Sequence, residues 1–211
     1  MKCLKEPLAR LANHQEKTRG FFFEGRFKSV AILDEESLLA TCAYIDLNPV
    51  AAGIAEVPEA SAHTSIKERA DHVKAQGRTE DLKAASEGSV AGSNAAAGME
   101  ESHWLCPIED RRRIDSSREG MLEGFSLGNY LLLVDYSGRL FREGKAMISR
   151  DVSAIFERLG TTAETWQARL EKLSKGRLMG RFFAASRQRL RDVAARLGLR
   201  RAVNLGSCLL A

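Results

Sequence analysis

Four segments in the second half of the sequence each begin with a serine or threonine and end at a glycine. They run from Ser126 to Gly138, from Ser149 to Gly160, from Thr161 to about Gly176 and from Ser186 to Gly198. Serine and threonine side chains accept hydrogen bonds from free backbone N–H groups at a helix start, and glycine commonly ends a helix. The series predicts packed helices, so residues 101–211 are expected to form a helical C-terminal domain.

The first part of the chain mixes helical and extended patterns. Residues 2–13 have leucines at helical spacing, and residues 20–33 are rich in aromatic and β-branched side chains, which indicates a strand. Asp34 is a residue type favoured at a helix start, and this helix is expected to end near Leu47, because a proline follows Asn48.

The region after this helix predicts one more short helix and then a linker. Ser65 and Glu68 form a capping-box pattern for a helix that extends to about Gln76. Residues 77–100 consist mainly of Ala, Gly, Ser and charged residues, which bury too little apolar surface to offset the entropy of ordering. We therefore expect residues 1–76 to form one domain and residues 77–100 to form a flexible linker.

Charge and cysteine content narrow the class of protein. The segment from Lys175 to Arg201 has nine basic residues and one acid, a net charge of +8, so the rest of the +4 chain carries −4. Such a segment suits a polyanion partner, and it is equally typical of a solvated helix face. The four cysteines are dispersed without a CxxC pair, and no apolar run could span a membrane. These features predict a cytoplasmic protein with no membrane partner.

Tyr44 stands apart on the helix that begins after Asp34. At about 100° per residue, the apolar residues fall on one stripe, whereas Tyr44 lies among small polar residues and shares its face with Asn48. The predicted stripe is Leu38, Leu39, Cys42 and Ile45. The pattern alone leaves two interpretations open, a surface tyrosine near a helix end and a functional tyrosine.

The sequence around Tyr44 resembles a known family. The segment GRFKSVAILDEESLLATCAYIDLNPVAAGIA is similar to the end of the catalytic domain of single-tyrosine HUH transposases, in particular the REP-associated tyrosine transposases. These carry a strand like W-x-G-R-F-K before a helix with Y-I-x-x-N-P-x-R-A-G. The resemblance covers about residues 2–67, and the later segments FSLGNYLLLVDYSGR and LGTTAETW resemble a C-terminal extension found in one branch of the family.

The resemblance implies a ferredoxin-like α/β transposase domain, of which this chain has the second half, and a chemistry for Tyr44. Its hydroxyl would attack a phosphodiester of single-stranded, hairpin-forming DNA and form a 5′-phosphotyrosine link, as in DNA transposition and recombination by bacterial mobile elements. A divalent ion, Mg²⁺ or Mn²⁺, makes the phosphate more electrophilic. In the family the ion is held by a His-x-His strand and by the residue in the position of Asn48. Association of the chain into a homodimer is a further expectation from the family.

Several family residues are missing from this sequence. No two of its four histidines, His14, His63, His72 and His103, lie two residues apart, so each is interpreted as an ordinary surface or loop residue. Asn48 alone would be an incomplete metal site, because one neutral oxygen does not retain hydrated Mg²⁺. Ala51 replaces the family's arginine, and Phe23 its usual tryptophan. We therefore expect no bound metal and no catalysis by this chain alone.

Further DNA contacts are predicted from basic residues. Arg26 and Lys28 flank the predicted strand and suit contacts to phosphates, although exposed strand edges often carry such residues. The segment after Ser186 predicts a basic helix that contacts the DNA backbone through Arg187, Arg189 and Arg191, with Leu190, Val193, Ala194 and Leu197 on its apolar face. A plain amphipathic helix that closes the bundle is the other interpretation. A helix-turn-helix is disfavoured, because Gly206 interrupts the short segment where a recognition helix would follow.

Three interpretations of function thus stay open. The first is a partial single-tyrosine transposase, the second a DNA-binding or assembly module without catalysis, and the third a gene remnant.

Overall fold

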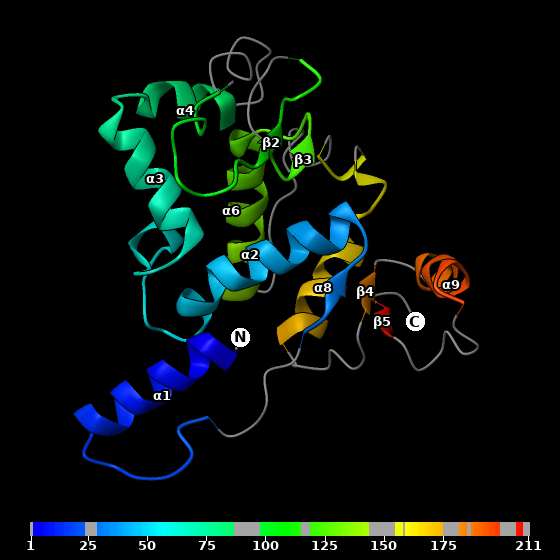
Figure 1. Cartoon of the computed structure of the whole chain (residues 1–211). Helices are drawn as coiled ribbons and strands as arrows, with labels where there is room; N and C mark the ends of the chain where they lie inside the picture. The colour runs from blue at the N-terminus through cyan, green and yellow to red at the C-terminus, as the bar shows by residue number, and fades with distance from the viewer. Residues whose placement is uncertain are drawn as a thin grey trace. The chain divides into compact units, whose positions relative to one another are not determined.

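The computed structural model describes residues 2–23, 29–86, 98–114, 119–143, 155–157, 159–174, 182–184, 187–198 and 206–208. The described chain is mainly helical with short strands, as the sequence predicts (Figure 1). Its contacts group it into two units, Met1–Ala31 and Ile32–Ala211, which are described separately. The predicted division into residues 1–76, 77–100 and 101–211 stays a prediction.

The first unit consists mainly of helix α1 (Lys2–Gln15), in agreement with the leucine spacing. Its leucines Leu4, Leu8 and Leu11 are exposed. The chain then turns at Asn13, whose side-chain amide donates to the Gly20 carbonyl at 3.0 Å. Residues 20–23 do not form the predicted strand, and the described part of the predicted segment contains the short strand β1 (Ala31–Ile32). Residues 24–28 lie outside the described part.

The second unit is organised around helix α2 (Glu35–Ala51). It begins as predicted, because the Ser37 backbone N–H donates to the Asp34 carboxylate at 2.8 Å. The predicted end near Leu47 is wrong, since the helix continues through Pro49 to Ala51. Proline leaves only one carbonyl without its helical partner, that of Ile45, whose residue is 57% exposed and accessible to water.

Helix α2 ends instead at a glycine with a left-handed backbone. Gly53 has a φ of 70°, and its N–H donates to the Val50 carbonyl, while the Ile54 N–H donates to the Pro49 carbonyl. These two bonds form a Schellman motif, which satisfies carbonyls that the last helical turn leaves open. The asparagine of the Asn-Pro pair therefore lies one turn inside the helix end.

The buried face of α2 differs from the predicted stripe. Leu38 and Cys42 are half-buried and Ile45 is exposed, so only Leu39 of the predicted set is fully buried. The buried residues of α2 are Ser37, Leu39, Ala40, Ala43, Asp46 and Leu47. Alanines let neighbouring helices approach closely, and hydropathy alone does not reveal this advantage over leucine or isoleucine.

Helix α3 (Ser65–Ala75) follows a short 3₁₀ turn, η1 (Pro58–Ala60). Its N-cap is Thr64, one residue before the predicted Ser65, and the Thr64 hydroxyl accepts from the Lys67 N–H at 3.4 Å. The Ser65 hydroxyl has another partner, the carboxylate of Asp46.

The expected linker contains regular structure. Helix α4 (Thr79–Ser86) lies within it and packs on helix α6, and Met99 and Glu100 are buried. The composition of residues 77–100 did not lead us to expect this helix or these buried residues, and residues 87–97 lie outside the described part. Composition did not indicate the burial of Glu100, because its ion-pair partner Arg69 lies 31 positions earlier in the chain.

Helix α6 (Leu127–Glu143) begins at Ser126 as predicted, since the Asn129 N–H donates to the Ser126 hydroxyl at 3.3 Å. It does not end at Gly138. A Cβ atom on Gly138 would lie 3.2 Å from Cδ2 of Leu47, so this glycine lets α6 approach α2 closely. The glycine signals a close helix contact here and not a helix end.

Helix α8 (Ala163–Ser174) begins after Thr162, whose hydroxyl accepts from the Thr165 N–H at 3.3 Å. The cap is one residue beyond the predicted Thr161. Gly160 and Gly198 both have a φ of 65° and follow helical segments, as predicted for helix-ending glycines. The predicted caps Ser149 and Ser186 lie outside the described residues.

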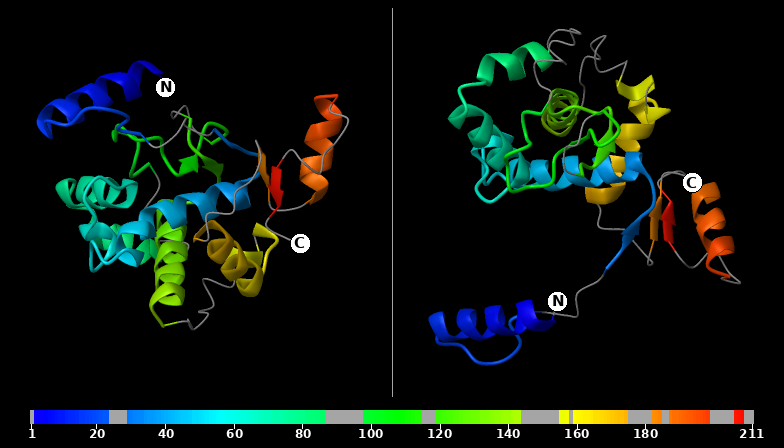
Figure 2. Two further views of the ribbon diagram at one scale, coloured as in Figure 1. Left: turned by 90° about the horizontal axis from the view of Figure 1, so that it is seen from below. Right: turned by 45° about the horizontal axis from the view of Figure 1, so that its top comes forward.

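Short parallel strand pairs complete the unit. Strand β2 (Glu109–Asp110) pairs with β3 (Leu122–Glu123), and β4 (Phe182–Ala184) pairs with β5 (Gly206–Cys208). Helix α9 (Arg187–Arg196) packs beside β4 and β5 (Figure 2). None of the helices in the described part is both long enough and apolar enough to span a lipid bilayer.

Buried polar side chains join α8 to the rest of the unit. Arg169 forms an ion pair with Glu36 at the start of α2 and donates to the Thr161 hydroxyl at 3.0 Å. Trp166 is fully buried, and its indole N–H donates to the Ser137 hydroxyl of α6 at 3.0 Å. Helices α2, α6 and α8 thus form one packed group (Figure 1).

Candidate functional site

Tyr44 and Asn48 line the same surface hollow, as their spacing of four residues predicts. The hollow has a volume of about 220 Å³ and is lined by Tyr44, Leu47, Asn48, Ala51, Ala52 and Ser174. Tyr44 is half-buried and Asn48 is exposed. The tyrosine side chain is therefore neither part of the packed core nor extended freely into water, and it borders open space.

The hollow combines two helices from distant parts of the sequence. Five of its lining residues belong to the C-terminal half of α2 or follow it directly, and Ser174 is the last residue of α8. The Arg169–Glu36 ion pair and the buried Trp166 fix α8 against its neighbours. The polar groups at the hollow are a phenol, an amide and an alcohol, which all bind phosphate oxygens by hydrogen bonds.

Two of the three polar side chains of the hollow, those of Tyr44 and Asn48, are available to a ligand, whereas the Ser174 hydroxyl donates to the Glu171 carbonyl at 2.8 Å. Within the described residues, neither the Tyr44 hydroxyl nor the Asn48 amide forms a side-chain hydrogen bond. Ala51 and Ala52 contribute no charge and leave the rim open. A guest at this hollow would therefore replace water as the partner of both side chains.

The described residues do not fit a metal site at this position. Across the described ranges, no group of three or more His, Cys, Asp or Glu side chains is close enough to bind a metal ion. Asn48 would contribute a single neutral oxygen, whereas Mg²⁺ binds through carboxylates and phosphates. The side chains of the hollow thus provide hydrogen bonds and no ligand cage.

The predicted basic contacts are only partly described. Arg26 and Lys28 lie outside the described residues. Arg187, Arg189 and Arg191 are exposed on α9, and none of the three lines the hollow. The predicted apolar face of α9 is correct for Leu190 and Ala194, which are buried, but Val193 is half-buried and Leu197 is 56% exposed.

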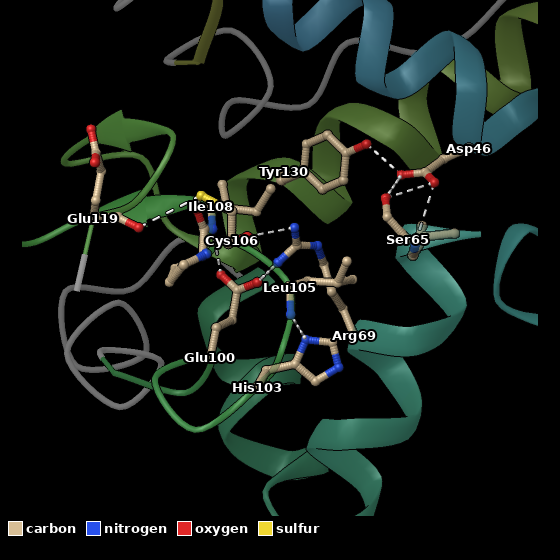
Figure 3. Close-up of polar contacts among 12 residues, drawn as sticks. Asp46, Ser65, Arg69, Glu100, His103, Leu105, Cys106, Ile108, Glu119 and Tyr130 are labelled. Carbon is tan, nitrogen blue, oxygen red and sulfur yellow. Dashed lines mark hydrogen bonds and ion pairs between the residues drawn. The ribbon is translucent and has the colours of Figure 1, made fainter. Parts of the chain in front are cut away.

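The sequence did not identify Asp46 of α2, whose side chain accepts several hydrogen bonds in the core. Asp46 is fully buried, two residues after Tyr44. Its carboxylate accepts from the Tyr130 hydroxyl at 2.5 Å, from the Ser65 hydroxyl at 2.9 Å to each oxygen, and from the Ile66 N–H at 3.3 Å. Figure 3 shows the carboxylate between Tyr130 and Ser65.

A second buried charge, Arg69 of α3, lies near this carboxylate. Arg69 forms an ion pair with Glu100 and donates to the Cys106 carbonyl at 2.8 Å, while the other Glu100 oxygen accepts from the Ile108 N–H at 2.9 Å (Figure 3). Burial lowers the pKa of Arg69, and the charge of Asp46 opposes this shift. The segment from Glu100 to Ile108 is thus attached to α3 by a buried charge pair.

Burial and the charge of Asp46 shift the pKa values of the neutral groups around this carboxylate. Burial is the main cause that raises the pKa of the Tyr130 hydroxyl well above its usual value, and the Asp46 carboxylate adds to the shift. Burial, with a further contribution from Asp46, raises the pKa of the Cys42 thiol to about 11. Both groups are therefore protonated at neutral pH, and Tyr130 is a permanent donor to Asp46.

The sequence contains only weak signals for the buried hydrogen bonds of Asp46. Asp46 lies between Ile45 and Leu47, and Tyr130 precedes three consecutive leucine residues, so each is a polar side chain within an apolar run. Such a residue is buried only with a partner, but a single sequence does not identify a partner 84 positions away. His103 lies in a loop, as predicted, but its side chain is buried, and its Nδ1 accepts from the Leu105 N–H at 3.3 Å.

Comparisons with known proteins add no family assignment. No family model matches the chain, and no curated protein and no solved structure matches it.

Proposed function

We propose that this chain is a transposase-like protein that binds single-stranded DNA at the Tyr44 hollow and does not cleave DNA on its own. The observation that carries this proposal is the position of Tyr44 beside Asn48, at an open hollow on the flank of α2. The resemblance of residues 2–67 to single-tyrosine HUH transposases supplies the identity of the ligand. Residues 1–76 would correspond to the second half of a ferredoxin-like catalytic domain.

The size and chemistry of the hollow suit a small part of a nucleic acid strand. Its volume of about 220 Å³ is below the range of typical drug-sized pockets. Its uncharged polar groups can hydrogen-bond phosphate oxygens, and the tyrosine ring can stack on a base. Electrostatic attraction to the DNA phosphates would come from basic residues outside the hollow. Among the described residues, the exposed arginines of α9 suit this role.

Strand cleavage is not expected from this chain alone. Attack by a tyrosine requires a phosphate made electrophilic, which a divalent ion achieves in the resembled family. The described residues at the hollow do not form a ligand set for such an ion.

The direct test incubates the chain with hairpin-flanked single-stranded DNA and Mn²⁺ and separates the products under denaturing conditions. We expect noncovalent binding by fluorescence anisotropy and no covalent adduct on the gel. An adduct that disappears in Tyr44→Phe would show a complete enzyme, and absence of any binding to single-stranded DNA would reject the proposal.

A DNA-binding module without transposase ancestry is the second candidate, and the exposed arginines of α9 favour it. It predicts that duplex DNA binds at least as tightly as single-stranded DNA of the same length, because phosphate contacts are independent of sequence and the duplex has the higher phosphate charge density. Binding at the Tyr44 hollow instead predicts a preference for single strands, since a stacked duplex does not present its bases.

A further inference from the structure

We propose that Asp46 is a positioning residue for the DNA site: its buried carboxylate fixes the rotation of α2 that turns Tyr44 and Asn48 toward the hollow. This inference rests on the function proposed above. It also assigns a role to the helical second half of the chain, because Tyr130 of α6 is one of the partners that hold the carboxylate.

Asp46 and Tyr44 point to nearly opposite sides of α2. Two residues along a helix correspond to a rotation of about 200°. Asp46 is fully buried between α3 and α6, whereas Tyr44 borders the open hollow. Any rotation of α2 that moves one of these side chains must therefore move the other.

The rest of the buried face of α2 does not define this rotation well. Leu39, Ala40, Ala43 and Leu47 pack through nonspecific apolar contacts, and the buried Ser37 hydroxyl has no hydrogen-bond partner in the described part. The Glu36–Arg169 ion pair holds the first turn of α2, about ten residues before Asp46. Alanine and leucine surfaces tolerate shifts in rotation, whereas a buried polar side chain has a defined set of partners. Asp46 is the only buried carboxylate on this face in the described part of the chain.

The partners of Asp46 come from two directions. The Ser65 hydroxyl and Ile66 N–H lie at the start of α3, and the Tyr130 hydroxyl comes from α6 (Figure 3). A turn of one residue would rotate the carboxylate by about 100° and break all three interactions. An unpartnered buried carboxylate is strongly unfavourable, so the alternative rotations of α2 are excluded.

Helices α6 and α8 in the second half of the chain are therefore part of the DNA-binding unit and do not form a separate domain. Tyr130 sets the orientation of α2, and Ser174 of α8 lines the hollow itself. Both contributions come from residues beyond the segment that resembles the catalytic domain. A fragment that ends before α6 should present Tyr44 in several orientations.

The test uses fluorine NMR on protein that contains 3-fluorotyrosine, because the chain has only three tyrosines, Tyr44, Tyr130 and Tyr136. Each signal is assigned by its loss in the corresponding Tyr→Phe variant. Broadening of the Tyr44 signal by a soluble paramagnetic agent then reports the exposure of this ring without DNA. Affinity for single-stranded DNA is measured in parallel by anisotropy.

The variants are Asp46→Ala, Asp46→Asn and Tyr130→Phe, with Ile108→Val as a control. Ile108 is buried and its side chain makes no contribution to the Asp46 carboxylate, so this change destabilises the fold without altering the partners of α2. Asparagine can still accept from Tyr130 and donate to the Ser65 hydroxyl, but its NH₂ group cannot accept from the Ile66 N–H, so Asp46→Asn is a partial rescue.

We expect Asp46→Ala and Tyr130→Phe to shift the Tyr44 signal, to increase its paramagnetic broadening and to weaken DNA binding about tenfold. Asp46→Asn should change both readouts less than Asp46→Ala does, and Ile108→Val should leave both readouts unaffected. If Asp46→Ala fails to fold, Tyr130→Phe alone tests whether the interactions of Asp46 orient Tyr44.

An unchanged Tyr44 signal in the folded Tyr130→Phe variant would overturn the inference, as would an equal change in Ile108→Val. If the unchanged protein binds no single-stranded DNA, the proposed function fails. The fluorine signal would then still decide whether Asp46 orients Tyr44.

Discussion

The Tyr130 hydroxyl donates a 2.5 Å hydrogen bond to the carboxylate of Asp46, a residue 84 positions earlier in the chain. This bond joins α6 to α2 within the core, while Tyr44, two residues before Asp46, borders an open hollow. One helix thus presents a fixed polar anchor on one side and the candidate DNA-contacting residue on the other. Several measurable consequences follow from this arrangement.

Removal of the Tyr130 hydroxyl should lower the stability of the protein. Tyr130→Phe removes a donor to a buried charge, so the free energy of unfolding should fall by about 1–3 kcal/mol. Urea unfolding followed by circular dichroism measures the loss. In a double-mutant cycle with Asp46→Ala, which removes the acceptor, the two losses should not add, because the residues share one interaction. Additive losses would contradict a direct partnership.

Gly138→Ala should stabilise the protein by about 0.5–1 kcal/mol, because alanine favours the interior of a helix over glycine. The new methyl group would lie 3.2 Å from Cδ2 of Leu47, so this leucine must shift by a few tenths of an ångström. Leu47 and Gly138 both line a cavity of about 410 Å³, which leaves space for the shift.

Gly53→Ala is the matched control for Gly138→Ala. Gly53 has a φ of 70°, so alanine there should cost about 1–2 kcal/mol. Thermal unfolding of both variants gives the comparison. A loss of stability in Gly138→Ala would mean that Leu47 has no room to shift.

The stability of the protein should decrease at alkaline pH. Burial raises the pKa of Cys42 from 9.0 to about 11, so the thiol of the folded protein stays protonated where the unfolded chain has lost its proton. The unfolded state then binds fewer protons, and stability falls as pH rises from about 9 to 11. The raised pKa of Tyr130 acts in the same direction.

The Cys42 contribution to this alkaline loss is at most about 2–3 kcal/mol. Unfolding measured between pH 7 and 11 should show a shallower decline in Cys42→Ala than in the unchanged protein. The Cys42 thiol should also react slowly with Ellman's reagent at pH 8, whereas the exposed Cys3 should react quickly. Equal reaction rates for the two thiols would contradict a raised pKa.

Neutralisation of the α9 arginines should weaken the salt dependence of DNA binding. Arg187, Arg189 and Arg191 are exposed on one helix, so replacement of all three by Gln should reduce the slope of log K against log salt by about 2, on the scale of 0.7 for each single-strand phosphate contact. The matched control replaces Lys67, Lys74 and Lys83 of α3 and α4 by Gln, which removes the same charge. An equal reduction in both variants would assign the effect to net charge alone.

Local signals in the sequence predicted most of the helix starts. Asp34 and Ser126 cap helices as expected, because an N-cap depends on residues within one turn. The helix ends at Pro49 and Gly138 were mispredicted for two different reasons. A proline in the last turn removes the hydrogen bond to only one carbonyl, and this carbonyl is exposed. A glycine inside a helix can allow another helix to pack closely against it.

The candidate site was predicted only in part. The spacing of Tyr44 and Asn48 placed both residues at one hollow, because a helical period relates them directly. Ser174 and Asp46 were not identified, since their roles depend on contacts with distant segments of the chain. A buried aspartate in an apolar run indicates that a partner exists, but only tertiary structure shows which one.

The most direct test of the central claim is a photo-crosslink between the protein and single-stranded DNA that carries 5-iododeoxyuridine, mapped by mass spectrometry of the digested complex. We predict a crosslinked peptide that contains Tyr44, and its loss in Tyr44→Ala, while a crosslink to α9 persists in that variant. Crosslinks confined to α9, with none at the Tyr44 hollow, would contradict the claim that this hollow receives the DNA strand.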